Sequence, residues 1–152
     1  MSQPLTPIPQ LPTEPARRIL RGMQRYFLEC YGVGGVPEVT LATGRRVDFM
    51  AVDRKGLIWV IEIKSCLADY RADAKWQSYL EYCDRFAFAV DEAFPQDVLP
   101  PEVGLFIADG YGADCLRDPV HSELAGARRK AVMLRYALTA AARLTGVDAP
   151  PP

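Results

Sequence analysis

The sequence has one histidine, no C-x-x-C pair and no long apolar run. Without an apolar run of about 18 residues, a membrane-spanning helix is excluded. A lone histidine, His121, leaves little support for a zinc site and weakens any Ser-His or Cys-His nucleophilic mechanism. It precedes a predicted helix, so we expect it at the surface. The remaining candidates for metal or redox chemistry are four separated cysteines, expected to be reduced, small and buried: Cys30, Cys66, Cys83 and Cys115.

The chain also lacks a strong net charge, since its formal charge is -1 over 152 residues. The charges are unevenly placed, however, with basic segments at 14–25 and 122–145 and an acidic segment at 91–118. The basic segments allow a local DNA contact, although solvated helix faces explain them equally well. The acidic segment favours a protein contact. The candidate DNA-binding residues are Arg17, Arg21, Arg25, Arg128, Arg129 and Lys130.

The first residues have neither a basic nor an apolar stretch typical of a signal peptide, so we expect a cytoplasmic protein. Five prolines within residues 1–15 predict an extended or disordered tail. Residues 16–147 are expected to form a single domain, and 148–152 a short second tail.

Hydrophobic periodicity predicts an α/β fold in which a mixed central sheet is flanked by helices and a long helix closes the chain. Helices are expected at 15–31, 72–83 and 122–145. Strands are expected at 37–44, 45–53, 57–64, 85–90 and 103–109, with a further strand left open at 113–118.

The sequence between the second and third strands predicts a hairpin. Arg54-Lys55-Gly56 suits a three-residue loop with glycine in the left-handed position, so Asp53 would face Leu57. Counting five residues away from the loop on each strand, Asp48 would then face Glu62, with both side chains on the same side of the sheet. The period of two adds Lys64 to that side.

Two carboxylates about 5 Å apart repel each other unless a cation lies between them. Lys64 can be that cation, and a divalent metal serves better, since Mg²⁺ prefers carboxylate, carbonyl, water and phosphate oxygens. The backbone carbonyl of Ile63 is a further candidate ligand. A partly buried salt-bridge cluster of Asp48, Glu62 and Lys64 explains the same pattern without a metal.

The D-x13-E-x-K arrangement on a hairpin, with a helix on each side in the chain, resembles the PD-(D/E)XK nuclease superfamily. Val47 stands where the superfamily label has a proline, at a variable position. The segments VDFMAVD, VIEIKSCLADYRADAKWQSYLEYCDRFAFAV and VGLFIAD resemble the MmcB-like family, small bacterial proteins assigned to DNA repair. The resemblance implies a restriction-endonuclease-like α-β-β-β-α-β core.

The resemblance further implies a deoxyribonuclease that uses Mg²⁺, or Mn²⁺ in its place. Asp48 and Glu62 would bind the metal and Lys64 would be the catalytic lysine. A polar residue from one of the first two core helices often joins such sites, and the candidates here are Glu29, Asp73, Lys75 and Gln77. The alternative is a non-cleaving module that binds DNA or another repair protein, and a homodimer is left open.

Other polar and aromatic residues near these segments have simpler expected roles. Trp76 and Tyr79 share a helix face with Cys83 and are expected to pack on the sheet, with base stacking as the alternative. Asp84 is expected to cap or pair with a neighbour, while its end of the sheet could lie near Lys64. Ser65 either supports the site or starts the following loop.

Overall fold

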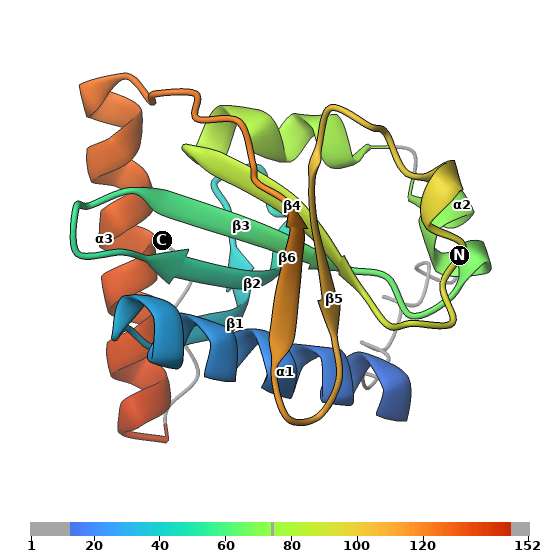
Figure 1. Cartoon of the computed structure of the whole chain (residues 1–152). Coiled ribbons are helices and arrows are strands. Elements are labelled where there is room, and N and C mark those ends of the chain that lie inside the picture. Colours follow the sequence, from blue (N-terminus) through green and yellow to red (C-terminus); the bar gives the residue numbers. More distant parts are fainter. Residues whose placement is uncertain (1–12, 74, 147–152) are drawn as a thin grey trace, which may run out of the picture.

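The computed structural model describes residues 13–73 and 75–146, which form a six-stranded mixed sheet with helices on both faces (Figure 1). The prediction of a mixed sheet with flanking helices and a long final helix is confirmed. Most of the predicted tails, 1–12 and 148–152, lies outside the described residues. The elements in chain order are α1 (Glu14–Tyr31), β1 (Gly35–Thr40), β2 (Arg46–Val52), β3 (Ile58–Ile63), α2 (Leu67–Ala72), the 3-10 helix η1 (Trp76–Tyr82), β4 (Arg85–Val90), the 3-10 helix η2 (Gln96–Val98), β5 (Gly104–Ala108), β6 (Ala113–Arg117) and α3 (Gly126–Leu144).

The strands follow one another across the sheet in sequence order, β1 to β6. The β1–β2, β2–β3 and β5–β6 pairs are antiparallel, whereas β3, β4 and β5 run parallel. The carboxyl ends of β3, β4 and β5 therefore lie at one end of the sheet. In α/β sheets this is the end where ligands usually bind.

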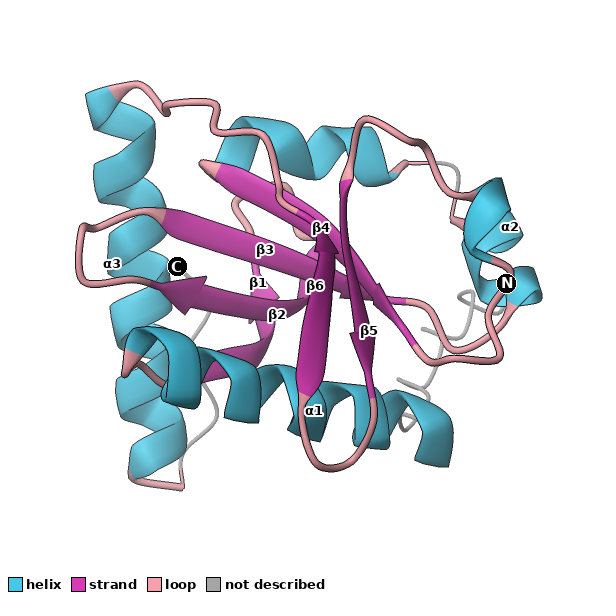
Figure 2. Ribbon diagram, in the orientation of Figure 1, coloured by secondary structure: helices cyan, strands magenta, loops and turns pink. Residues whose placement is uncertain are grey.

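Two apolar cores lie on opposite faces of the sheet, and Figure 2 shows the helices that flank the strands. On one face, α1 buries Ile19, Met23 and Phe27 against the sheet. Residues of η1 and α3 cover the other face. The alternation of side chains along β2 and β3 explains this division, because successive residues point to opposite faces.

The β2–β3 hairpin has the predicted loop, and Gly56 takes the left-handed conformation at φ +82°. Asp53, only 8% exposed, fixes the loop through both carboxylate oxygens. Its Oδ1 accepts hydrogen bonds from the backbone N–H groups of Lys55 and Leu57 at 2.9 and 3.0 Å. Its Oδ2 accepts one from the Trp59 indole at 3.0 Å. The sequence analysis had given Asp53 no role beyond its place in the turn.

Two predicted helices have different bounds in the structure. The segment predicted as one helix at 72–83 is divided between the end of α2 and the separate 3-10 helix η1. Asp73 follows α2, and its carboxylate accepts hydrogen bonds from Lys64 and from the backbone of Lys75, which draws the chain away from a continuous helix. The final helix starts at Gly126 rather than 122, because Asp84 binds the backbone N–H groups of Ser122 and Leu124.

The cysteine prediction was wrong in part. Only Cys83 is buried; Cys30 and Cys66 are exposed, and Cys115 is intermediate. Cys30 lies on the outer side of α1, and Cys66 precedes α2. All four are free, as expected, and His121 is exposed, as expected.

Asp84 has the structural role that the sequence analysis favoured. Its side chain is fully buried and binds the Arg129 guanidinium through two contacts of 2.6 Å, and the backbone N–H of Ile58 at 2.7 Å. Burial alone would raise the pKa of Asp84, but these hydrogen bonds outweigh it and the pKa is lowered. Asp84 precedes β4, at the opposite end of the parallel β3–β4 pair from Lys64, so it does not join the predicted site.

We predict that Asp53→Ala lowers the free energy of unfolding by about 3 kcal/mol, because three backbone and indole N–H groups lose their acceptor. Asp91→Ala is the matched control, since the Asp91 carboxylate accepts an exposed hydrogen bond from Ala93. Its cost should stay below about 1 kcal/mol. Urea denaturation measures both, and equal losses would contradict the role of Asp53.

We predict that Arg129→Met costs about 3 to 5 kcal/mol at neutral pH, because the buried Asp84 carboxylate loses its cation. Lys130→Met, on the exposed neighbour, should change stability by less than about 0.5 kcal/mol. A lowered native pKa stabilises the fold above the unfolded pKa, so this contribution disappears as the pH falls below about 4. A pH-independent difference between wild type and Arg129→Met would contradict this.

Candidate metal and phosphodiester site

The β2–β3 register brings Asp48 opposite Glu62, as the hairpin predicted. Phe49 pairs with Ile61 and Met50 with Val60, and the same register continued by one residue joins Asp48 and Glu62. Both side chains lie on the face of the sheet that η1 and α3 cover, because they alternate with Phe49 and Ile61 of the α1 core. The register thus places two carboxylates side by side at one end of β3.

Each carboxylate binds the backbone of the other strand. Glu62 Oε1 accepts a hydrogen bond from the Asp48 N–H at 3.0 Å, and Asp48 Oδ2 accepts one from the Ile63 N–H at 2.8 Å. These bonds fix both side chains through one oxygen each. The second oxygens, Asp48 Oδ1 and Glu62 Oε2, are the atoms with which the pair can bind a cation.

Both carboxyl groups hold their protons more tightly than usual. Glu62 is 3% exposed, and its burial followed by the nearby charge of Asp48 raises its pKa well above the usual value. Burial also raises the pKa of Asp48, although its hydrogen bond from Ile63 and the charge of Lys64 oppose this effect. The pair therefore favours a bound cation or a shared proton over two bare negative charges.

Lys64 is buried beside this pair, but its direct partner is a third carboxylate. The ammonium Nζ lies 2.8 Å from Asp73 Oδ2, and the lysine side chain is 8% exposed. The charge of Lys64 still lowers the pKa of Asp48 and Glu62. Of the four auxiliary candidates, Asp73 is thus the one that contacts a predicted catalytic residue.

The other three auxiliary candidates are exposed at the surface. Glu29 is exposed on α1 and pairs with Arg25 at 3.0 Å. Lys75 and Gln77 are exposed at the start of η1. Ser65 donates a hydrogen bond to Asp69 at 2.6 Å, so it stabilises the first turn of α2.

The donor set fits a hard, oxygen-preferring cation such as Mg²⁺. In residues 13–73 and 75–146, no cluster of three or more His, Cys, Asp or Glu side chains is suited to hold a metal. A cation here would have two protein carboxylates, with its other ligands from carbonyl oxygen, water or phosphate, which is a common arrangement for Mg²⁺. In an extended strand the N–H and C=O of one residue point to the same edge, so the Ile63 carbonyl is expected on the Asp48 side.

The basic residues proposed from sequence occupy two separate surfaces. The exposed arginines of α1 are next to acidic residues, with Arg17 and Arg21 near Glu14. On α3, across the sheet, Arg129 is bound to Asp84 and the Arg128 guanidinium lies 4.3 Å from the centre of the Tyr82 ring. The two helices therefore do not form one continuous basic surface.

Two further cations near Asp48, which the stripes of basic residues did not indicate, are Arg45 just before β2 and Arg46 at its first position. They line a pocket of about 390 Å³ with Lys75, Ala72, Asp73 and Tyr79. Trp76 and Tyr79 pack in the core, as expected. The Arg45-Arg46 dipeptide was a usable signal, because residues close to Asp48 in the chain share its surroundings in the fold.

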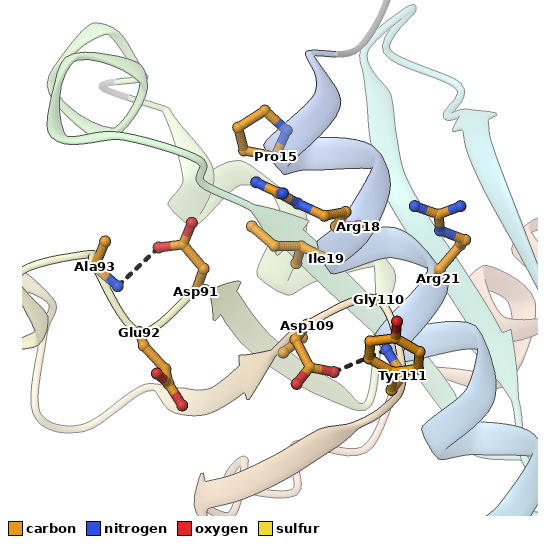
Figure 3. Close-up of a pocket in the computed structure, with 11 residues that line it drawn as sticks. Pro15, Arg18, Ile19, Arg21, Asp91, Glu92, Ala93, Asp109, Gly110 and Tyr111 are labelled. Atoms are coloured by element: carbon orange, nitrogen blue, oxygen red, sulfur yellow. Dashed lines mark hydrogen bonds between the residues drawn. The ribbon is translucent and has the colours of Figure 1, made fainter.

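A larger pocket, of about 580 Å³, lies between α1 and the segments after β4 and β5 (Figure 3). Its lining includes Arg18 and Arg21, but also the carboxylates of Asp91, Glu92 and Asp109 (Figure 3). This pocket is lined by both positive and negative side chains. Among its lining residues, only Arg21 was predicted from the sequence to belong to a functional site. We therefore assign the candidate site to the Asp48–Glu62 pair.

Comparison with known proteins supports a DNA repair family. The model of a family described as DNA repair protein MmcB-like matches residues 4–150. A solved structure described as the SPO1766 protein of unknown function from Silicibacter pomeroyi is 49% identical, with a TM-score of 0.83, over 89% of this chain and 92% of that chain. A search of curated proteins gave no match. Among the described residues, no helix has both the length and the apolar character needed to cross a bilayer.

We predict that Glu62→Gln stabilises the metal-free protein increasingly as the pH rises. A raised native pKa means that the folded state keeps a proton that the unfolded state has lost, so wild-type stability falls from about pH 4.3 up through the native pKa. Glutamine does not ionise, so the variant lacks this loss of stability at higher pH. Its amide oxygen can still accept the hydrogen bond from the Asp48 N–H. Denaturation in EDTA across pH measures the difference, and a constant difference would contradict the assignment.

Proposed function

The chain belongs to the MmcB-like family of DNA repair proteins, and from this premise we propose that it is a metal-dependent deoxyribonuclease of the PD-(D/E)XK type. The observation that carries the proposal is the pair of half-buried Asp48 and buried Glu62, whose pKa values are raised, with the buried Lys64 two residues after Glu62. Groups with strongly shifted pKa values cluster at functional sites, which makes this pair a candidate for chemistry.

In the proposed reaction, water attacks a DNA phosphodiester in line with the leaving oxygen. Asp48 and Glu62 would hold Mg²⁺, and the ion would supply polarisation of the phosphodiester and a lower pKa for a water. Lys64 orients the attacking water or balances charge on the phosphoryl oxygens. Asp73 holds the Lys64 ammonium in place through their 2.8 Å contact.

We predict that the protein cleaves some form of DNA with Mg²⁺ or Mn²⁺, and that Lys64→Ala lowers the rate by about 100-fold or more. The assay covers duplex, single-stranded, flapped and branched DNA. Lys55→Ala, an exposed lysine in the hairpin loop, is the matched control. Asp48→Asn is a second inactive variant, and loss of carboxylate repulsion should keep it folded if Lys64→Ala unfolds.

The alternative is a module that binds DNA or a repair protein without cleaving it. The near-complete burial of Glu62, at 3% exposure, and the pairing of Lys64 with Asp73 favour this reading, because both suit a structural cluster. Calorimetry with Mn²⁺ separates the two functions. Binding that is lost in Asp48→Ala and in Glu62→Ala supports the enzyme, whereas no binding to the wild type supports the module.

A further inference from the structure

The pocket next to the carboxylate pair is lined by three cations, Arg45, Arg46 and Lys75, and is called the basic pocket below. It adjoins the candidate site through two of its members. Asp73 lines the pocket and binds Lys64, and Tyr79 lies close enough to Glu62, Asp73 and Asp48 that their charges help to raise its pKa, after burial. The basic pocket therefore lies beside the candidate site.

The balance of charge in the basic pocket favours an anion. Its one acidic lining residue, Asp73, is already hydrogen-bonded to the Lys64 ammonium at 2.8 Å and to the Lys75 N–H at 3.1 Å. Arg46 lies 3.8 Å from Glu38, but the two side chains are 46% and 39% exposed, and a pair with this much solvent contact contributes little. The larger pocket of Figure 3, by contrast, sets three carboxylates against two arginines.

The walls of the basic pocket are held in place by hydrogen bonds between distant parts of the chain. The Arg45 guanidinium donates to the Lys75 carbonyl at 3.2 Å and to Ser78 Oγ at 2.9 Å, which joins the start of β2 to η1. The Tyr79 hydroxyl lies 3.5 Å from the Arg46 carbonyl. Arginine presents several donors in one plane, so Arg45 can make these contacts and still face a phosphate.

We infer that the basic pocket binds a backbone phosphate of the substrate DNA, next to the phosphodiester at Asp48 and Glu62. This inference rests on the proposed function, because it takes DNA as the ligand. Arg46 and Lys75 supply the exposed charge, and Arg45 fixes the pocket. Phosphate contacts position DNA without reading its sequence, so the pocket sets how a strand lies across the carboxylates.

The test measures DNA affinity against salt concentration by fluorescence anisotropy, in EDTA so that the DNA stays intact. Labelled single-stranded and duplex oligonucleotides are separate arms. Arg46→Ala and Lys75→Ala should each weaken binding and reduce the slope of log K against log salt by about 1. Lys55→Ala removes the same charge from the exposed hairpin loop and should leave the slope unchanged. Thermal melts confirm that each variant is folded.

The outcomes separate this inference from the nuclease proposal. Wild-type slope and affinity in both pocket variants would overturn the inference, as would a wild type that binds neither oligonucleotide. Weakened binding in the pocket variants, with no cleavage by the wild type under any metal, would support the basic pocket and contradict the nuclease. Cleavage by the wild type, together with unchanged DNA binding in the pocket variants, would support the nuclease and contradict the basic pocket.

Discussion

The register of the β2–β3 hairpin is the constraint on which the rest of the site depends. Asp53 and Gly56 fix the loop, and the pairs that follow bring Asp48 opposite Glu62. Because side chains alternate along a strand, a slip of one residue would send one carboxylate to the α1 face. The buried indole bond of Trp59 to Asp53 resists such a slip far from the carboxylates. The loop thus sets the positions of the two carboxyl groups at the other end of the hairpin.

Asp84 and Glu62 are two buried carboxyl groups whose surroundings shift their pKa values in opposite directions. Asp84 receives hydrogen bonds from Arg129, Ile58 and Leu124, and its pKa is lowered. Glu62 is also buried, but it lies against another carboxylate and its pKa is raised. Asp84 therefore stabilises the fold as it stands, whereas ionised Glu62 destabilises it until a cation arrives. Such a cost is expected to persist where it serves a function.

The sequence could predict the parts of the fold that depend on local rules. Apolar runs located the strands, and the turn residues located the hairpin and its register, including Asp48 opposite Glu62. The break between α2 and η1 was missed because it depends on Asp73 reaching Lys64, a contact between separate segments. The start of α3 was misplaced for a similar reason, since Asp84 binds the backbone before it. Tertiary hydrogen bonds, which leave no periodic pattern, decided both boundaries.

The placement of the basic residues also could not be predicted from sequence patterns, because it depends on which separate segments meet in the fold. Stripes of arginine on two helices suggested DNA contacts, but the fold places α1 and α3 on opposite faces and ties Arg129 to Asp84. Arg45 and Arg46 form no stripe, yet they share a pocket with Asp73 beside the carboxylates. A phosphate held there would be attracted by these cations, while its neighbour would meet the carboxyl groups of Asp48 and Glu62. A divalent cation at those two residues would oppose the repulsion, so cation binding and DNA placement would be coupled through charge.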